Sequence, residues 1–277
     1  MNDLIPPEED QAALWNGAAG QAWVDAQAVL DYMFRPFEQH LAERVAASPG
    51  PVLDVGCGTG ATTLALARRS GHPCLGVDLS EPMIALARKR ADREMLPVEF
   101  TCADAQTHPF EPGVFDRIVS RFGVMFFGDP VQAFSNLHRA ARPGAGLCLV
   151  AWRSAAENPF MTTAERAAAP LLPQLPPRRP GAPGQFAFAD RERVRRILQD
   201  SGWREIDIRP LDLRCRFPER DLMLYLTRLG PVGRVLQDLE ETMRRRIVEV
   251  VRVAFEPYVR GDTVCFDAAC WEVGARA

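Results

Sequence analysis

The chain has 277 residues, 47% of them hydrophobic, which is enough to form a large core without disulfides or metal. Its 33 basic and 36 acidic residues leave a formal charge of -3, which argues against a nucleic-acid-binding protein. No apolar run approaches the roughly 18 to 20 residues of a membrane span, and the acidic residues 1–10 lack a signal-peptide pattern. We therefore expect a cytoplasmic protein without a membrane span.

The basic residues are almost all arginine, because Lys89 is the only lysine in the chain. A Walker loop, which needs a lysine after its glycines, is therefore excluded. The Tyr-x-x-x-Lys pair of short-chain dehydrogenases is also excluded, since Ala85 stands four residues before Lys89. The seven cysteines are odd in number and include no Cys-x-x-Cys pair, so the sequence indicates neither a disulfide framework nor a metal site.

Residues 1–48 are expected to form an N-terminal helical lid. Within them, residues 10–47 have the pattern of two helices. Their apolar surface is too large for a free tail, so we expect it to pack on the rest of the protein. The side chains concerned are Trp15, Trp23, Val29, Leu30, Met33, Phe34 and Phe37.

Residues 49–153 alternate short apolar runs with helical segments, which predicts a doubly wound α/β domain with a parallel sheet. Ser80 is the expected N-cap of one helix, and Pro143-Gly144 ends another. The predicted strands lie near 51–55, 74–78, 97–101, 115–120 and 145–152, and the predicted helices at 61–69, 81–91 and 131–142.

Residues 154–189 are expected to be a proline-rich lid segment, and residues 190–277 to complete the sheet. The stretch that contains the prolines from 170 to 183 is expected to lack regular structure. In the second region we expect a helix at 190–200, strands near 205–213 and 263–273, and one long amphipathic helix between these strands. The inserted helices would form part of a ligand pocket. The prolines are 170, 173, 176, 177, 180 and 183, and the helix stripe is Val232, Val235, Leu236, Leu239, Met243, Ile247 and Val251.

A glycine-rich turn, Gly56-Cys57-Gly58-Thr59-Gly60, joins the first predicted strand of the core to a helix. Glycine lets the backbone approach a ligand closely, and a helix N-terminus offers free N–H groups. The spacing also fits the dinucleotide pattern G-x-G-x-x-G/A, with Asp78 as the acid for the ribose. An NAD(P)-dependent oxidoreductase is therefore an alternative at this point.

Two further acids favour a cationic adenosyl ligand. Asp54 precedes the glycines by two residues, where it suits an amino group better than a pyrophosphate. Asp104 ends the third strand, where it can accept a hydrogen bond from an exocyclic amine such as that of adenine.

The ordered motifs LDVGCGTG (53–60), GVDLS (76–80), ADA (103–105), FD (115–116) and RPG (142–144) resemble the class I S-adenosylmethionine-dependent methyltransferases, of the ubiquinone/menaquinone-biosynthesis type. The resemblance covers residues 51–152 and implies a Rossmann-like sheet of seven strands whose last strand is antiparallel. One departure is Gly144-Ala145-Gly146, where that family has a glycine pair.

The resemblance also implies roles for residues that match its motifs. Asp54 and the glycine loop would hold the methionine part of the cofactor, Asp78 the ribose, and Asp104 the adenine edge. Trp23, with Trp15-Asn16-Gly17, resembles a lid element over the methionine end. The implied cofactor-binding residues are Asp54, Gly56, Cys57, Gly58, Gly60, Asp78, Leu79, Met83, Asp104, Ala105, Ser120, Arg121, Phe122 and Trp23.

The implied reaction is methyl transfer from S-adenosylmethionine, leaving S-adenosylhomocysteine, to an O, N or C atom of a small apolar or aromatic acceptor. Such an enzyme acts mainly by proximity and in-line alignment. A base is needed only if the acceptor must lose a proton, and His40, on the second N-terminal helix, is the candidate. A non-catalytic adenosyl-binding module is a further alternative, and the sequence leaves a homodimer possible.

Overall fold

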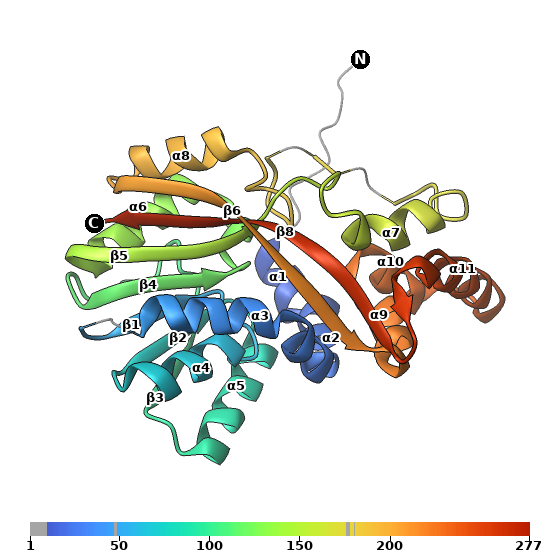
Figure 1. Ribbon diagram of the computed structural model, residues 1–277, viewed down its shortest axis with the longest axis horizontal. Helices are drawn as coiled ribbons and strands as arrows, with labels where there is room; N and C mark the ends of the chain where they lie inside the picture. Colours follow the sequence, from blue (N-terminus) through green and yellow to red (C-terminus); the bar gives the residue numbers. More distant parts are fainter. Residues whose placement is uncertain (1–9, 47–48, 176–177, 180) are drawn as a thin grey trace.

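The computed structural model describes residues 10–46, 49–175, 178–179 and 181–277. In this part of the chain, eight strands form one sheet in the order β3-β2-β1-β4-β5-β8-β6, with β7 paired to β8 (Figure 1). The strands are β1 (Val52–Val55), β2 (Cys74–Asp78), β3 (Val98–Cys102), β4 (Phe115–Arg121), β5 (Ala141–Trp152), β6 (Arg204–Pro218), β7 (Val259–Arg260) and β8 (Thr263–Arg276).

The first five strands run parallel, and β8 is antiparallel to both of its long neighbours, β5 and β6. The predicted doubly wound, Rossmann-like sheet with an antiparallel last strand is therefore confirmed. The prediction had seven strands, and the additional one is β7. It has only two residues, paired as Val259 with Val264 and Arg260 with Thr263, which is too short for a hydrophobic pattern to reveal.

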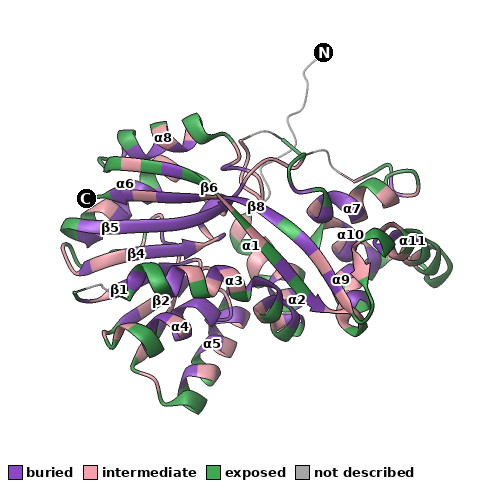
Figure 2. Cartoon of the chain, in the orientation of Figure 1, coloured by how far each residue is buried: buried purple, intermediate pink, exposed green. Residues whose placement is uncertain are grey.

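Helices cover both faces of the sheet, as right-handed crossovers require (Figure 1). One face carries α3 (Gln27–Val45), α4 (Ala61–Ser70) and α5 (Glu81–Glu94), and the other carries α6 (Pro130–Ala140) and α8 (Arg191–Asp200). Every residue of β1 is buried, and the buried side chains extend as one cluster from α3 through the sheet to β8 (Figure 2). The boundaries of the four predicted regions stay predictions.

The N-terminal region has three helices where the sequence predicted two. They are α1 (Gln11–Asn16), α2 (Ala18–Asp25) and α3. Gly17 leaves the helical region with φ -98° and ψ -145°, and Ala26 separates α2 from α3 with ψ 10°. The apolar spacing alone did not reveal these breaks. As expected, the region packs on the core, with Val29, Met33 and Phe37 buried.

The predicted long helix after β6 is also divided. The chain forms α9 (Leu222–Arg228), α10 (Gly230–Val235) and α11 (Glu241–Ala254), because Leu239 and Glu240 have extended backbones between the last two. The predicted lid segment begins with α7 (Pro159–Ala168), and the described residues of the proline-rich stretch after it, 170–175, 178–179 and 181–184, form no helix or strand, as expected. The first proline of the lid segment, Pro159, stands at a helix start, where proline is tolerated. The prolines 176, 177 and 180 lie outside the described residues.

A cap of helices lies at one end of the sheet. The outer parts of β6 and β8 extend past their neighbours and carry α9, α10 and α11, with α7 beside them (Figure 1). Because α10 also contacts α2, the cap and the N-terminal helices enclose the carboxyl ends of the parallel strands. Among the described residues, no helix has the length and hydropathy to cross a bilayer.

Candidate functional site

A cavity of about 410 Å³ opens at the carboxyl ends of β1, β2 and β4, where ligands bind in open α/β sheets. Its volume is in the range of small-molecule sites. Strand ends and the glycine loop form one part of the lining, and the N-terminal and cap helices form the rest. Ten of the predicted cofactor-binding residues line it, namely Gly56, Gly58, Asp78, Leu79, Met83, Asp104, Ala105, Arg121, Phe122 and Trp23.

The glycine loop leaves open space at Gly58. This residue has φ +56°, and a Cβ built on it would meet only Met83 Sδ, at 3.8 Å. Gly56, with φ +66°, instead lies against a second backbone segment, because its Cβ would approach the Cα of Gly123 to 2.5 Å. Sequence reasoning missed Gly123, whose signal would have been a glycine just after the end of β4. The loop therefore offers a cradle at Gly58 and a tight backbone contact at Gly56.

Asp78 ties the end of β2 to the glycine loop and lines the cavity. Its Oδ2 accepts a hydrogen bond from Gly58 N at 2.7 Å, and its Oδ1 accepts one from Ser80 N at 2.9 Å. Burial raises the pKa of this carboxyl, while these backbone N–H groups oppose the rise. The two bonds fix the carboxylate in one orientation, where its remaining lone pairs can accept hydrogen bonds from a ligand.

Asp104 lies on the next loop along the same edge. Its Oδ1 accepts hydrogen bonds from Gln106 N at 2.9 Å and from Gln106 Nε2 at 3.2 Å. The side chain of Asn136 holds this loop in place by donating to Ala105 O at 2.9 Å. Gln106 also lines the cavity, and sequence reasoning missed it because an amide after Asp-Ala carries no recognisable pattern.

Asp54 is buried and Arg121 is half-buried, and these two oppositely charged groups have unused hydrogen-bonding capacity. Asp54 is 1% exposed, and Thr63 Oγ1 donates to its Oδ2 at 2.6 Å. Among the described residues, Asp54 Oδ1 and Arg121 Nη1 have no hydrogen-bond partner. Burial raises the pKa of Asp54 to about 6, although Thr63 and Arg121 oppose the rise. Burial lowers the pKa of Arg121, whose guanidinium lies 5.6 Å from the Phe34 ring.

Four predicted cofactor residues do not line the cavity. Asp54, Cys57 and Gly60 lie behind the loop surface. A Cβ on Gly60 would come within 2.9 Å of the Phe100 ring, so this glycine allows packing. Ser120 was expected to bind the cofactor, but its buried Oγ accepts hydrogen bonds from Gly123 N at 3.2 Å and Val124 N at 3.3 Å. It therefore supports the turn after β4.

His40, the candidate base, also lies outside the cavity. Its Nε2 is 3.3 Å from Glu272 Oε1, and Arg44 binds the same carboxylate. The helix α3 presents Met33 and Phe34 to the cavity, whereas His40 is two turns further along and faces β8. The expectation that His40 points into the acceptor site is therefore corrected.

Aromatic side chains line the part of the cavity beyond the strand ends. The ring of Phe122 stacks on Trp152 with centroids 4.6 Å apart, and Phe122 has the unusual φ of +67°. Trp15 packs edge-on against Trp23 and Phe126, at 5.9 and 5.0 Å. The cap adds Phe160, Tyr225 and Phe255. No histidine, cysteine, serine, threonine or lysine is among the described residues that line this space. The described residues also contain no cluster of three or more potential metal ligands.

The N-terminal helices α1 and α2 are anchored beside the end of β2 by Asn16. Its Nδ2 donates to Leu79 O at 3.1 Å, and its Oδ1 accepts from Glu81 N at 2.9 Å. Ser80 Oγ donates to Trp15 O at 2.6 Å. Asn16 thus supplies the cap of α5 that was expected from Ser80. A Cβ on Gly20 would come within 2.7 Å of Ser80 Oγ, so this glycine allows the close approach.

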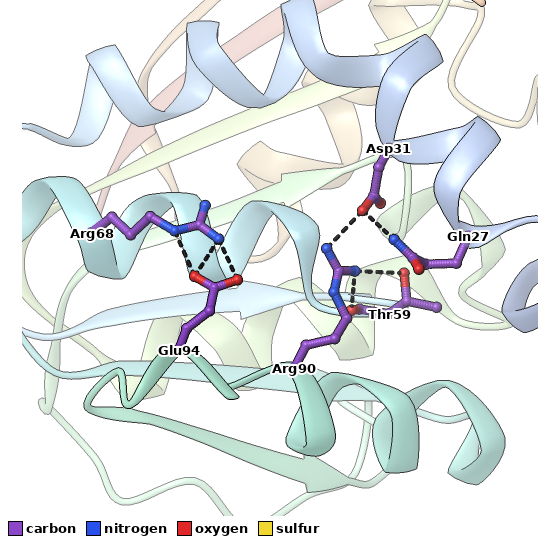
Figure 3. Close-up of polar contacts among 6 residues, drawn as sticks. All are labelled: Gln27, Asp31, Thr59, Arg68, Arg90 and Glu94. Carbon is purple, nitrogen blue, oxygen red and sulfur yellow. Dashed lines mark hydrogen bonds and ion pairs between the residues drawn. The ribbon is translucent and has the colours of Figure 1, made fainter. Parts of the chain in front are cut away.

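A second anchor joins α3 to the glycine loop (Figure 3). Arg90, on α5, donates from Nη1 to Thr59 O at 2.6 Å, and its Nη2 lies 2.6 Å from Asp31 Oδ2. Gln27 donates to the same Asp31 oxygen. The ion pair is largely shielded from solvent, with side-chain exposures of 16% and 21%. The helix that carries Met33 and Phe34 is therefore held against the loop that carries Gly58.

Residues 52–144 match the family model described as "Methyltransferase domain". A demethylmenaquinone methyltransferase of Thermus thermophilus is 38% identical over 104 residues, which cover 37% of this chain and 47% of that protein. A demethylmenaquinone methyltransferase of Deinococcus radiodurans is 29% identical over 172 residues, which cover 59% of this chain and 71% of that protein. The chain spans about half the length (47% and 54%) of the first curated relatives that it matches.

Solved structures with the same fold include a phosphoethanolamine N-methyltransferase of Haemonchus contortus in complex with phosphomonomethylethanolamine and S-adenosylhomocysteine. Its TM-score is 0.57 at 19% identity, covering 95% of this chain and 59% of that one. A [4+2]-cyclase has a TM-score of 0.59 at 17% identity, covering 98% and 97%. Because these two proteins have different activities, the likeness supports the fold and not a reaction.

Proposed function

We propose that this chain, whose residues 52–144 match the methyltransferase domain model, transfers the methyl group of S-adenosylmethionine to a small, largely apolar or aromatic acceptor. The predicted resemblance to class I methyltransferases of the menaquinone type is confirmed by the family match and the demethylmenaquinone methyltransferase relatives. The activity of the whole chain, its acceptor and its partners are our proposals.

The observation that carries the proposal is the continuity of the cavity. One space joins the polar strand ends, with Gly58, Asp78 and Asp104, to the aromatic part with Phe122 and Trp152. A cofactor at the first part would therefore share an enclosed volume with an apolar acceptor at the second. Such an arrangement aligns two reactants and excludes water, which is the main contribution that a methyltransferase must make.

The residues present fit S-adenosylmethionine, which when bound supplies a methyl group on a positively charged sulfonium. The fixed carboxylate of Asp78 suits two ribose hydroxyls, and Leu79 and Met83 suit the adenine ring. Asp104 and the Ala105 N–H would read the adenine edge. Gly58 leaves the floor open, because a side chain there would project toward the cavity and Met83.

The methionine end of the cofactor carries an ammonium and a carboxylate. We assign the carboxylate to Arg121, whose Nη1 is buried without a partner in the described part of the chain. Asp54 interacts electrostatically with Arg121 and would compensate the ammonium from behind the loop. Charge-assisted hydrogen bonds of this kind contribute about 1.5 to 3 kcal/mol each.

The residues that line the main cavity indicate which kind of acceptor it can hold and whether a protein base can assist the transfer. Since no described lining residue is a histidine, the proposed transfer proceeds by alignment without a histidine base. Tyr225 is no base either, because burial raises the pKa of its hydroxyl well above the ordinary value. The aromatic lining suits a planar acceptor, and two relatives are named demethylmenaquinone methyltransferases. A homodimer and a cytoplasmic location stay predictions.

Turnover tests the proposal. The full chain is incubated with methyl-labelled S-adenosylmethionine and matched naphthalene acceptors that carry a hydroquinone, a phenol or an amine. We expect label transfer to at least one aromatic acceptor, and loss of transfer in Asp78→Asn. Binding of S-adenosylmethionine without transfer to any member of a broad acceptor panel would instead favour the non-catalytic adenosyl-binding module.

A further inference from the structure

A second cavity, of about 240 Å³, lies at the opposite end of the sheet from the first. Its floor is the sheet itself. Arg117, near the start of β4, pairs in register with Gly146 of β5, which pairs in turn with Arg276 of β8. Arg121, four residues further along β4, lines the first cavity, so the two sites lie at different ends of one strand.

Four arginines line this second cavity, and two of them have carboxylate partners. Arg44 Nε lies 2.6 Å from Glu272 Oε1, and its Nη2 donates to Oε2 at 3.0 Å. Arg209 Nε lies 3.1 Å from Asp207 Oδ2, and its Nη2 lies 3.5 Å from Glu272. The positive charges of Arg44 and Arg209 are therefore compensated by two of the three acids in the cavity, leaving Glu205.

Arg117 and Arg276 are the other two arginines, and in the described ranges neither forms an ion pair. The Nε of Arg117 is buried without a hydrogen-bond partner in the same ranges. Its guanidinium lies against Gly146, where a side chain would collide with it. Arg276 donates one hydrogen bond, to Gly144 O at 3.1 Å. Burial lowers the pKa of Arg117, and the positive charge of Arg276 lowers it further.

We propose that this cavity is a binding site for a small oxyanion, a phosphate or carboxylate group, with Arg117 and Arg276 as its ligands. Two like charges that face one cavity repel each other, and a desolvated guanidinium without a counterion is costly. An oxyanion bound between Arg117 and Arg276 would offset both the repulsion of the two positive charges and the cost of a guanidinium without a counterion. The planar, forked guanidinium suits the oxygens of these groups. Gly274, on which a Cβ would meet nothing within 3.9 Å, leaves room on the floor.

The test is a thermal-unfolding titration of the full chain with sodium phosphate against sodium chloride at constant ionic strength. Wild type should gain stability saturably with phosphate. Arg117→Gln should weaken the apparent phosphate affinity about tenfold or more. Arg214→Gln is the matched control, because Arg214 forms an exposed pair with Asp267 elsewhere on β6, and it should leave the phosphate response unchanged.

In sodium chloride, the difference in stability between Arg117→Gln and wild type should have the opposite sign to that in phosphate. Without phosphate, Arg117→Gln should be at least as stable as wild type, because it removes a half-buried charge that has no ion-pair partner among the described residues. Arg276→Gln, at an exposed position, should lose phosphate affinity in the same way and guards against a folding defect. Acetate in place of phosphate tells whether a monoanionic carboxylate suffices. No saturable gain over chloride, or an equal gain in wild type and both variants, would overturn the site. Binding of S-adenosylhomocysteine, measured in parallel, should survive both substitutions.

Discussion

Asp78 has the most constrained carboxylate on the adenosine side of the site, because both oxygens accept backbone N–H groups. In Asp78→Asn one oxygen becomes an NH₂ group, which cannot accept from an N–H and carries no charge. We expect S-adenosylhomocysteine to bind about ten- to a hundredfold more weakly, as measured by calorimetric titration. Asp267→Asn, at an exposed ion pair, should bind as wild type does. Equal affinities in Asp78→Asn and wild type would remove Asp78 from the site.

Gly58 and Gly71 form a matched pair of left-handed glycines, with φ +56° and +68°, and neither has an atom that would clash with a Cβ. Alanine at either position should therefore cost the same strain, about 1 to 2 kcal/mol of unfolding free energy. Only Gly58 lines the cavity. We expect Gly58→Ala alone to weaken binding of S-adenosylhomocysteine, by more than about tenfold.

The Gly58 prediction is checked by denaturant unfolding and calorimetry on both variants. The outcome that contradicts it is similar ligand affinity in Gly58→Ala and Gly71→Ala.

Asp54 makes stability depend on pH. Burial raises its pKa in the folded protein to about 6, above the ordinary value of 3.8, so the folded state holds an extra proton between these values. The unfolding free energy should therefore fall as pH rises from about 4 to 6, by up to about 3 kcal/mol from this group. The Asn side chain of Asp54→Asn cannot titrate, so the variant should lack this contribution to the fall of the unfolding free energy with pH.

Denaturant unfolding of wild type and Asp54→Asn between pH 4 and 7 measures the Asp54 contribution as a difference. A difference that does not change with pH would show that folding leaves the pKa of Asp54 at its ordinary value, and one that rises in favour of wild type toward pH 6 would show that folding lowers this pKa. Either result contradicts the prediction.

The lid helices depend on Asn16, which bonds to Leu79 O and caps α5 at Glu81 N. Asn16→Ala should lose about 1 kcal/mol of stability, as lost caps do, and release α1 and α2 from the adenosine side. We expect faster dissociation of S-adenosylhomocysteine, followed by stopped-flow fluorescence of Trp15 and Trp23, which line the cavity.

Asp190→Ala is the control for the Asn16 experiment, because Asp190 caps α8 on the outer face through Glu192 N and Arg193 N. It should lose similar stability without a change in the dissociation rate. The same dissociation rate in Asn16→Ala and wild type would mean that the lid anchor does not govern ligand release.

The sequence predicted the elements whose signal is local. Continuous apolar runs identified β1 to β5, and the glycine loop identified the start of α4. It did not predict features that depend on distant partners. Asn16 acts on residues 63 and 65 positions away, and His40 faces Glu272, 232 positions along the chain. The breaks at Gly17 and Leu239 interrupt helices whose apolar spacing continues through them.

In the whole molecule, the fold and the strand-end acids could be predicted because they follow from motifs in a fixed order. The joining of the polar strand ends to an aromatic chamber could not, since that chamber is closed by α7, α9 and α10, and by Phe255 after α11, from the far part of the chain. The arginine-lined cavity at the other end was equally hidden. Its residues come from α3, β4, β5, β6 and β8, and no local pattern brings them together.

The central claim is that the main cavity binds S-adenosylmethionine rather than a nicotinamide dinucleotide. Calorimetric titration of the full chain with S-adenosylhomocysteine, and separately with NADH, tests it directly. We expect saturable binding of S-adenosylhomocysteine, weakened in both Asp78→Asn and Gly58→Ala, and no saturable binding of NADH. Saturable binding of NADH, with none of S-adenosylhomocysteine, would contradict it.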